Sequence, residues 1–354
     1  MSVIFAILLF SLLIFVHELG HFLAAKASKV QVNEFSMFMG PAIWKKKRGE
    51  TLYSIRCIPI GGYCAMEGED VDTDNPRSFQ KAAWWKRLII LVAGSGMNFL
   101  IGFLIVVIVN SCALMPITQV ESLRTGSSLA MAGGLQAGDV ILEMDGQKLE
   151  TTNDFSLILQ KDLTDTSFDV LVVRNGQQLL LKDVIMEPRE FPENEEGQAG
   201  TFYGITWATR KMSFTEVVAA SWNDCVYFAK TVWLSLGMLL SGDAKLQDMS
   251  GPVGIVSMMT DMATNSGSVM AAVLNLLYFG GFIAINLGVM NLLPIPALDG
   301  GRVLALLLTT GIEGITKKKI DPKYEGYIHA AGMVLLLLLM AVIMFKDIFV
   351  IFKG

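Results

Sequence analysis

The chain has 354 residues, 53% of them hydrophobic and 17% charged, and a formal net charge of −5 at pH 7. Together with a mean hydropathy of +0.51, this composition argues against two or three soluble domains and predicts an integral membrane protein. The four cysteines form no C-x-x-C pair, which favours neither a disulfide framework nor a thiolate zinc site. We expect free thiols at Cys57, Cys64, Cys112 and Cys225.

Four apolar segments are long enough to cross a bilayer, because its hydrocarbon core of about 30 Å takes about 20 helical residues. They run from Val3 to Ala25, Leu88 to Leu114, Ala272 to Pro296 and Tyr327 to Phe352. The first segment could be read as a signal peptide that ends near Ala27. However, no basic region precedes Val3 and the apolar run is too long, so we predict a retained membrane helix.

The stretches that follow the first and second helices have the composition of β structure. Glu34 to Met66 is rich in strand formers and contains Gly61 and Gly62, which predicts a β-hairpin at the membrane boundary. Met115 to Arg189 alternates β-rich runs with turn signals and predicts a compact domain near the lower size limit for one core. Its turn signals are Gly138-Asp139, Asp145-Gly146 and Asn175-Gly176.

The rest of the second connection begins with an acidic linker, Phe191 to Gly200, and continues with apolar residues at helical spacing from Ser213 to Leu240. Because the latter segment includes Asp224 and Lys230, it suits an amphipathic helix on the membrane surface better than a fifth span. The expected layout is helix 1–26, loop 27–87 with the hairpin at 34–66, helix 88–114, β domain 115–189, linker and peripheral helix 190–271, helix 272–301, loop 302–326 and helix 327–352.

The charges predict how these parts face the two sides of the membrane. Between Lys26 and Arg87 there are 11 basic and 7 acidic residues, and between Arg302 and Lys323 there are 5 and 2. Between Cys112 and Asn275 the numbers reverse to 10 and 20. By the positive-inside rule the hairpin loop is cytoplasmic, and the β domain and both termini are extracytoplasmic. The fold class is thus an α-helical polytopic membrane protein with an inserted β-rich domain.

The most informative motif is His17-Glu18-Leu19-Gly20-His21, an H-E-x-x-H pattern inside the first apolar helix. Positions i and i+4 share one helix face, so the two imidazoles can bind one zinc ion, while Glu18 can reach a water as general base. A satisfied polar cluster without metal is the alternative. It is less favoured, because polar groups inside an apolar helix cost several kcal/mol unless paired, buried or metal-bound.

A catalytic zinc normally takes three protein ligands, so a third ligand is needed. Glu325 and His329 begin the fourth helix, but Asp299 is the better candidate. It follows Pro294 and Pro296, which break the third helix, and irregular backbone at membrane depth is tolerated where it is buried in protein or lines a wet cavity. In the predicted topology the three ligands lie at similar depth, towards the cytoplasmic face.

The two motifs together carry a family resemblance that covers essentially the whole chain. The chain contains H-E-L-G-H in the first helix, a β domain with the sequences Ala137 to Leu142 and Asp145 to Gln147, and N-L-L-P-I-P-A-L-D-G-G from Asn291. These features resemble the site-2 protease family of intramembrane zinc metalloproteases (peptidase family M50), in particular its bacterial RseP/RasP type. The β domain resembles a PDZ domain in the circular arrangement of bacterial proteases. PDZ domains bind peptides by strand addition.

The resemblance implies one catalytic zinc ion held by His17, His21 and Asp299, with Glu18 as catalytic base. It also implies that Asn291 contacts the unwound substrate and that the hairpin pairs with substrate. Further substrate-binding candidates are Asn98, Gly61, Gly62, Pro294 and Pro296. The second helix has Ala93-Gly94-Ser95-Gly96-Met97-Asn98-Phe99 where the family has A-G-P-x-x-N-F, so Asn98 matches and Ser95 replaces a proline.

The implied partners are single-span membrane proteins already cut by a site-1 protease, such as anti-sigma factors or remnant signal peptides, in a bacterial cytoplasmic membrane and without nucleic acid. Two other functions remain open. A zinc transporter would also hold intramembrane histidines, but it would need neither Glu18 nor the β domain. An inactive scaffold that binds membrane peptides would keep the β domain and could lose Glu18.

Overall fold

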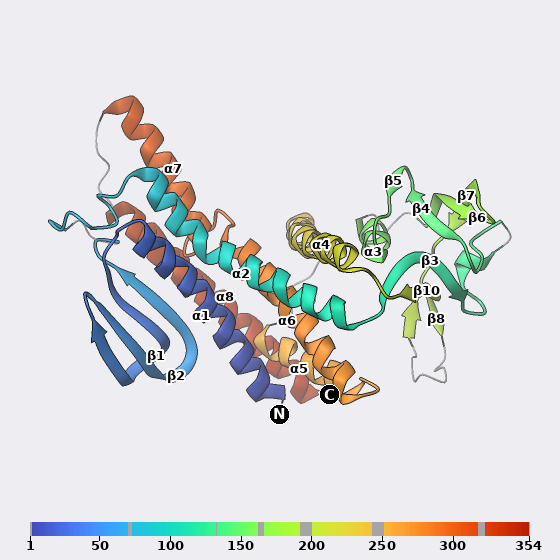
Figure 1. Cartoon of the computed structure of the whole chain (residues 1–354), viewed down its shortest axis with the longest axis horizontal. Coiled ribbons are helices and arrows are strands. Elements are labelled where there is room, and N and C mark those ends of the chain that lie inside the picture. The colour runs from blue at the N-terminus through green and yellow to red at the C-terminus, as the bar shows by residue number, and fades with distance from the viewer. Residues whose placement is uncertain are drawn as a thin grey trace. The chain divides into compact units, whose positions relative to one another are not determined.

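The computed structural model describes residues 2–69, 73–131, 133–161, 166–191, 200–242, 251–317 and 323–353 (Figure 1). The chain divides into two compact units, one made of Met1–Val106 with Ser235–Gly354 and the other of Val107–Leu234. Helices α2 (Trp84–Cys112) and α4 (Phe214–Ser241) each run from one unit into the other. The predicted acidic linker lies almost entirely outside the described residues.

Four described helices are long and apolar enough to cross a membrane. The spans are Phe5–Ala27 in α1 (Ser2–Ala27), the whole of α2, the whole of α6 (Val269–Asn291), and Gly326–Asp347 in α8 (Lys323–Lys353). The prediction of a helical protein with four candidate membrane spans is therefore confirmed. Helix α4 is not among these spans, as its charged residues led us to expect.

Small residues let three of the spans approach closely. A Cβ atom on Gly20 of α1 would lie 2.3 Å from the carbonyl oxygen of Ala93 on α2. On α6, a Cβ atom on Gly288 would lie 3.0 Å from the carbonyl oxygen of Ser95 on α2. Close backbone approach at small residues is the usual basis of helix association in membranes. It brings α1, α2 and α6 together around the H-E-x-x-H turn.

The predicted hairpin consists of two long, bent strands, β1 (Val32–Arg48) and β2 (Thr51–Met66), which lie against α1 (Figure 1). Because both strands bend, Ser36 of β1 pairs with Ser54 and also with Tyr63 of β2, while Lys45 pairs with Ser54. The result is a small antiparallel sheet in which the segment near Tyr63 forms one edge. At the bend of β2, the hydroxyl of Ser11, in the first half of the first span, donates a hydrogen bond to the Pro59 carbonyl at 2.8 Å.

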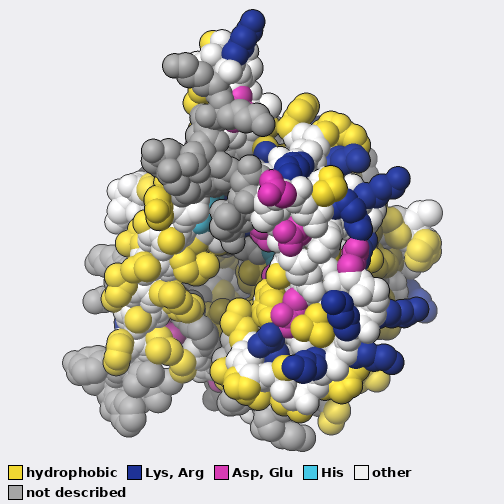
Figure 2. Space-filling view, turned by 90° about the vertical axis from the view of Figure 1, so that its left-hand side faces the viewer, with side chains coloured by type: hydrophobic (Ala, Val, Ile, Leu, Met, Phe, Trp, Pro, Cys, Tyr) yellow, Lys and Arg dark blue, Asp and Glu magenta, His cyan; other side chains and the backbone are white. Residues whose placement is uncertain are grey.

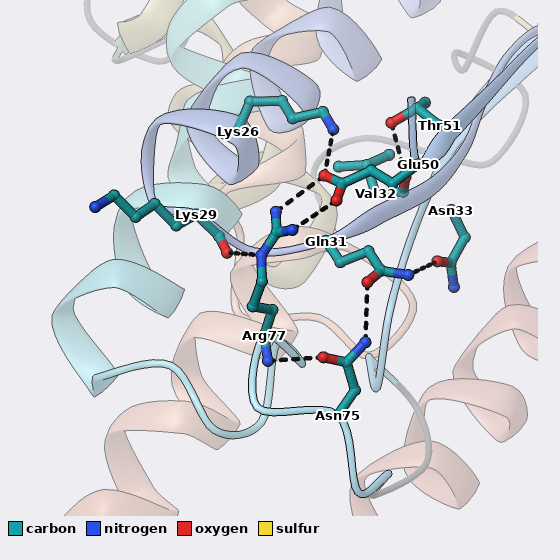
Figure 3. A network of polar contacts seen from close by, with 9 residues as sticks. All are labelled: Lys26, Lys29, Gln31, Val32, Asn33, Glu50, Thr51, Asn75 and Arg77. Atoms are coloured by element: carbon teal, nitrogen blue, oxygen red, sulfur yellow. Dashed lines mark hydrogen bonds and ion pairs between the residues drawn. The ribbon is translucent and has the colours of Figure 1, made fainter. Parts of the chain in front are cut away.

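A polar network fixes the other end of this sheet to the end of α1 (Figure 3). Glu50, in the turn between β1 and β2, accepts hydrogen bonds from Lys26 at 2.7 Å and from Arg77 at 2.6 and 2.9 Å. The Arg77 and Lys26 hydrogen bonds hold the pKa of Glu50 at about 2. The sheet is thus held at the Glu50 turn and at the Pro59 bend.

Two further helices belong to the first unit and differ from our expectation. We expected a loop at 302–326, but α7 occupies Asp299–Thr316, where Leu306 is fully buried in a cluster with Ala25 and Ile90. We expected a linker up to residue 271, but α5 (Pro252–Thr264) buries Met259 among residues of α1 and α6. Both segments are apolar on one face only, so neither resembled a span in the sequence.

The second unit contains the β-rich region. Strands β3 (Met115–Leu123), β4 (Val140–Met144), β6 (Ser167–Arg174) and β7 (Gln177–Ile185) are joined at one edge by β10 (Ile205–Arg210), while the short β5 (Gln147–Lys148) pairs with β4. Helix α3 (Thr152–Lys161), the 3-10 turn Ser128–Ala130 and the paired strands β8 (Arg189–Phe191) and β9 (Gly200–Phe202) complete the unit. The sheet extends beyond the boundary at 189 that we expected.

A hydrophobic core lies within this second unit, and a polar cluster joins its helices. Ile141, Val172 and Phe155 are among its buried residues. Asp224 of α4 accepts hydrogen bonds from Asn153 of α3 at 2.7 Å and from Asn110 at the end of α2 at 2.9 Å. The four cysteines of the chain are free, as predicted.

Candidate functional site

Three side chains from two distant parts of the sequence meet at one point. His17 Nε2 lies 3.0 Å and His21 Nε2 lies 3.3 Å from Asp299 Oδ2, and the two imidazole nitrogens are 3.1 Å apart. Both histidines are buried. Within the described ranges this is the group of histidine, cysteine and acidic side chains close enough to share a metal ion. The i, i+4 spacing on α1 and the position of Asp299 at the first residue of α7 produce this convergence.

The donor atoms fit a zinc ion. Nitrogen and oxygen ligands about 2.0–2.1 Å from a tetrahedral zinc are about 3.3–3.4 Å from one another, close to the 3.0–3.3 Å found here. Asp299 Oδ2 is shielded from solvent and, in the described part of the chain, has no hydrogen-bond donor besides these imidazoles. Two imidazole nitrogens and a carboxylate oxygen in such proximity require a proton or a cation between them.

The imidazole of His21 is held in the form that binds metal through Nε2. Its Nδ1 lies 2.8 Å from the backbone carbonyl oxygen of Ile90 on α2. A carbonyl oxygen can only accept a hydrogen bond, so Nδ1 carries the hydrogen and Nε2 presents its lone pair to the cluster. A metal-binding histidine usually donates its other ring N–H to such an acceptor, because this hydrogen bond fixes both the tautomer and the ring orientation.

The ring of His17 has two amides beside its other nitrogen. Asn98 Nδ2 of α2 and Asn291 Nδ2 at the end of α6 lie 3.3 and 3.4 Å from His17 Nδ1. Asn98 is fully buried and its Oδ1 has no hydrogen-bond partner within the described residues. A half-turn of this amide brings Oδ1 onto Nδ1, where it accepts the Nδ1 hydrogen and leaves Nε2 free for metal.

Glycines make room for this cluster. A Cβ atom on Gly94 of α2 would lie 2.3 Å from His21 Nε2 and 2.8 Å from His17 Cε1. At the start of α7, Cβ atoms on Gly300 and Gly301 would lie 2.2 Å from the Leu292 carbonyl oxygen and 2.3 Å from that of Ile295. None of these glycines is among the site residues expected from the sequence.

Glu18 lies between the cluster and the sheet. A Cβ atom on Gly62 of β2 would be 3.6 Å from Glu18 Cγ, so this edge of the sheet passes directly beside the Glu18 side chain. Gly62 pairs with Met37 on its other side. Figure 2 shows histidine side chains in the hollow of one face, with acidic side chains beside it.

The remaining candidates from the sequence lie around this centre. Gly61 and Gly62 are on the edge segment of β2, and Pro294 and Pro296 lie in the break between α6 and α7. His329, the alternative third ligand, lies outside the group that could share a metal, and its Nδ1 accepts a hydrogen bond from the Ala297 backbone. Arg302 of α7 pairs with Glu69 beside the site, a contact that the sequence did not predict.

Comparison with known proteins agrees with a metal-dependent peptidase. The sequence matches Peptidase family M50 over residues 5–339. A Clostridium acetobutylicum protein named "Putative zinc metalloprotease" is 36% identical over 352 residues, covering 98% of this chain and 97% of that protein. The "Regulator of sigma-W protease RasP" of Bacillus subtilis is 28% identical over 429 aligned positions, covering 98% of both chains.

These findings define the class of protein as a multi-pass membrane metalloprotease that uses zinc. The chain belongs to peptidase family M50 and is a metalloprotease of the site-2 type. "Zinc metalloprotease RasP" of Shouchella clausii, 28% identical over 98% of each chain, is a further relative.

Proposed function

We propose that this protease cleaves transmembrane segments of single-span membrane proteins, with zinc held by His17, His21 and Asp299 and with Glu18 as general base. The convergence of two imidazole nitrogens and one carboxylate oxygen within 3.3 Å is the observation that carries the proposal. Since α1 is one of the four candidate spans, the chemistry would take place at membrane depth.

Bound zinc supplies a Lewis acid that polarises the scissile carbonyl and lowers the pKa of the attacking water. Glu18 takes the proton from that water and returns it to the leaving amine. The Ile90 carbonyl keeps the His21 ring in its metal-binding form through the 2.8 Å contact with Nδ1. Because Asn98 is fully buried beside His17, we now assign it to orienting that ring instead of touching substrate.

A transmembrane helix hides its peptide bonds in internal hydrogen bonds, so a substrate must unwind before it can be cut. The β2 edge at Gly61 and Gly62 runs beside Glu18, and an extended substrate that adds to this edge as a strand would place its backbone near the base. Asn291, half-buried at the end of α6, is our candidate for a second contact with that backbone. Pro294 and Pro296 would shape the same side of the site.

We further propose that the hairpin sheet and active site face the cytoplasm and that the second unit and both termini face outwards, in line with the charge distribution. The β-rich part of that unit would act as a PDZ-like gate or sensor for substrates already trimmed by another protease. The name of the Bacillus subtilis relative, regulator of sigma-W protease, supports membrane-bound regulators such as anti-sigma factors as one substrate class, beside remnant signal peptides.

The test compares detergent-solubilised wild type with Glu18→Gln on a single-span helical substrate. We expect about one zinc ion per chain in both proteins and cleavage that is about 10²-fold to 10⁴-fold slower in the variant than in wild type. Retained cleavage by Glu18→Gln would refute the role of Glu18. Zinc binding without cleavage by wild type would favour a transporter or a scaffold.

A further inference from the structure

The break between α6 and α7 contains one backbone donor that is satisfied from another helix. Pro294 and Pro296 have no N–H group, and four other residues of the break donate to carbonyl oxygens of α6 or of the break itself: Leu292, Leu293, Ile295 and Leu298. The Ala297 N–H instead donates to His329 Nδ1 of α8 at 3.1 Å. The third histidine of the chain therefore contacts the segment that leads into Asp299.

Ala297 also has an unusual backbone conformation. Its φ of 79° lies in the left-handed region, which residues other than glycine avoid because Cβ crowds the neighbouring carbonyl oxygen. Such a conformation persists only where the surroundings hold it. In the described part of the break, His329 supplies the hydrogen bond that fixes the Ala297 peptide group.

Helix α8 packs against the break at the same place. Gly332, almost one turn after His329, has no side chain, and a Cβ atom there would lie 2.4 Å from Pro296 Cβ and 2.8 Å from the Pro296 carbonyl oxygen. Gly301 of α7 likewise packs on the Ile295 carbonyl oxygen of the break. The break is thus enclosed by the first turn of α7 and by the His329–Gly332 face of α8.

Asp299 comes two residues after Ala297, and its Oδ2 must reach both His17 Nε2 and His21 Nε2. The φ of Ala297 sets the direction in which the chain enters α7, and hence where this carboxylate lies. We infer that His329 is a positioning residue of the metal centre, which holds Ala297 in its left-handed conformation so that Asp299 meets the two histidines. The inference rests on the proposed role of Asp299 as a zinc ligand.

The experiment measures the zinc dissociation constant of the full-length protein by competition with a chelator of known affinity. The variant His329→Phe keeps a ring but loses the hydrogen-bond acceptor for the Ala297 N–H. In His329→Asn, the side-chain Oδ1 takes the place of Nδ1 as acceptor. Ile328→Phe is the matched control, because it adds the same ring to a neighbouring position that is 59% exposed. Ala297→Gly removes the free-energy cost of the left-handed conformation. It is measured alone and combined with His329→Phe.

We expect His329→Phe to weaken zinc binding on the order of tenfold, the usual effect of removing a residue that orients a metal ligand. His329→Asn and Ile328→Phe should bind zinc as tightly as wild type does. In the Ala297→Gly background the effect of His329→Phe should shrink, since glycine needs no external support there. Should His329→Phe not accumulate as folded protein, His329→Leu takes its place as the variant without an acceptor.

The inference is overturned if His329→Phe binds zinc as tightly as wild type, if His329→Asn is as weak as His329→Phe, or if Ala297→Gly leaves the loss unchanged. Asp299→Ala, measured alongside, separates the two proposals. If Asp299→Ala loses zinc while His329→Phe does not, only the positioning role fails. If Asp299→Ala keeps the affinity of wild type, the proposed ligand set itself fails.

Discussion

Replacing Gly94 with alanine should disrupt the metal centre without removing any proposed ligand. The added carbon would lie 2.3 Å from His21 Nε2, 2.7 Å from His21 Cε1 and 2.8 Å from His17 Cε1. Unstrained contacts between such atoms need about 3.5 Å, so an imidazole must move by roughly 1 Å. Displacements of about 1 Å cost on the order of 10²-fold in a site of defined geometry. We therefore expect zinc affinity and cleavage to fall by roughly 100-fold.

Gly96→Ala is the control for this prediction. It adds the same methyl group to the same helix, but a Cβ atom on Gly96 meets nothing within 4 Å. Both substitutions raise helix propensity by about 1 kcal/mol, so the difference between the variants isolates the contact with the histidines. The assay is chelator competition on the purified full-length proteins, followed by cleavage at saturating zinc. Equal zinc affinity of Gly94→Ala and Gly96→Ala would refute the reasoning.

Three further predictions concern other contacts. A Cβ atom on Gly62 would lie 3.0 Å from the Ser36 carbonyl oxygen and 3.6 Å from Glu18 Cγ, so Gly62→Val should shift the β2 edge and press its larger side chain on Glu18; kcat should fall roughly tenfold to 100-fold with zinc content unchanged, and loss of zinc would contradict it. The pKa of Glu50 is lowered from 4.5 to about 2 by Arg77 and Lys26, so its contribution to stability is present above about pH 4.5 and is lost as pH falls towards 2. The melting temperature of Glu50→Gln should therefore lie below that of wild type at pH 7 and approach it in acid; a difference that persists at pH 2 would argue against the network. Asp224→Ala removes an acceptor from the amides of Asn153 and Asn110, of which Asn110 keeps the Ser221 hydroxyl at 3.0 Å. It should destabilise the second unit by about 1–2 kcal/mol, measured as faster limited proteolysis, whereas unchanged proteolysis would show that the cluster contributes little.

The sequence contained enough information to predict that His17, His21 and Asp299 meet, since i and i+4 of one helix must share a face and a proline-broken helix implies a site. It was also sufficient to predict the four candidate spans, because the length and hydropathy of a span are properties of a single segment. The role of Gly94 could not be predicted in this way. A glycine in an apolar helix has many explanations until the partner helix is known, and here the partner side chains are His17 and His21.

The same limit explains the elements that we missed. The turn signals of the β domain predicted strands up to Arg189, but β10 joins β3 across more than 80 residues of sequence, and no local pattern records that pairing. Helix α7 follows the two prolines and is apolar on one face only, so its sequence resembled a loop. The contact between His329 and Ala297 likewise depends on where α8 packs.

X-ray absorption spectroscopy of the zinc-loaded full-length protein tests the central claim most directly. Our interpretation predicts two imidazole nitrogens and otherwise oxygen ligands at about 2.0–2.1 Å, with one oxygen contribution lost or replaced in Asp299→Ala. A third imidazole in wild type, which only His329 could supply because the chain has 3 histidines, would contradict the ligand set of His17, His21 and Asp299. A sulfur ligand would contradict it equally.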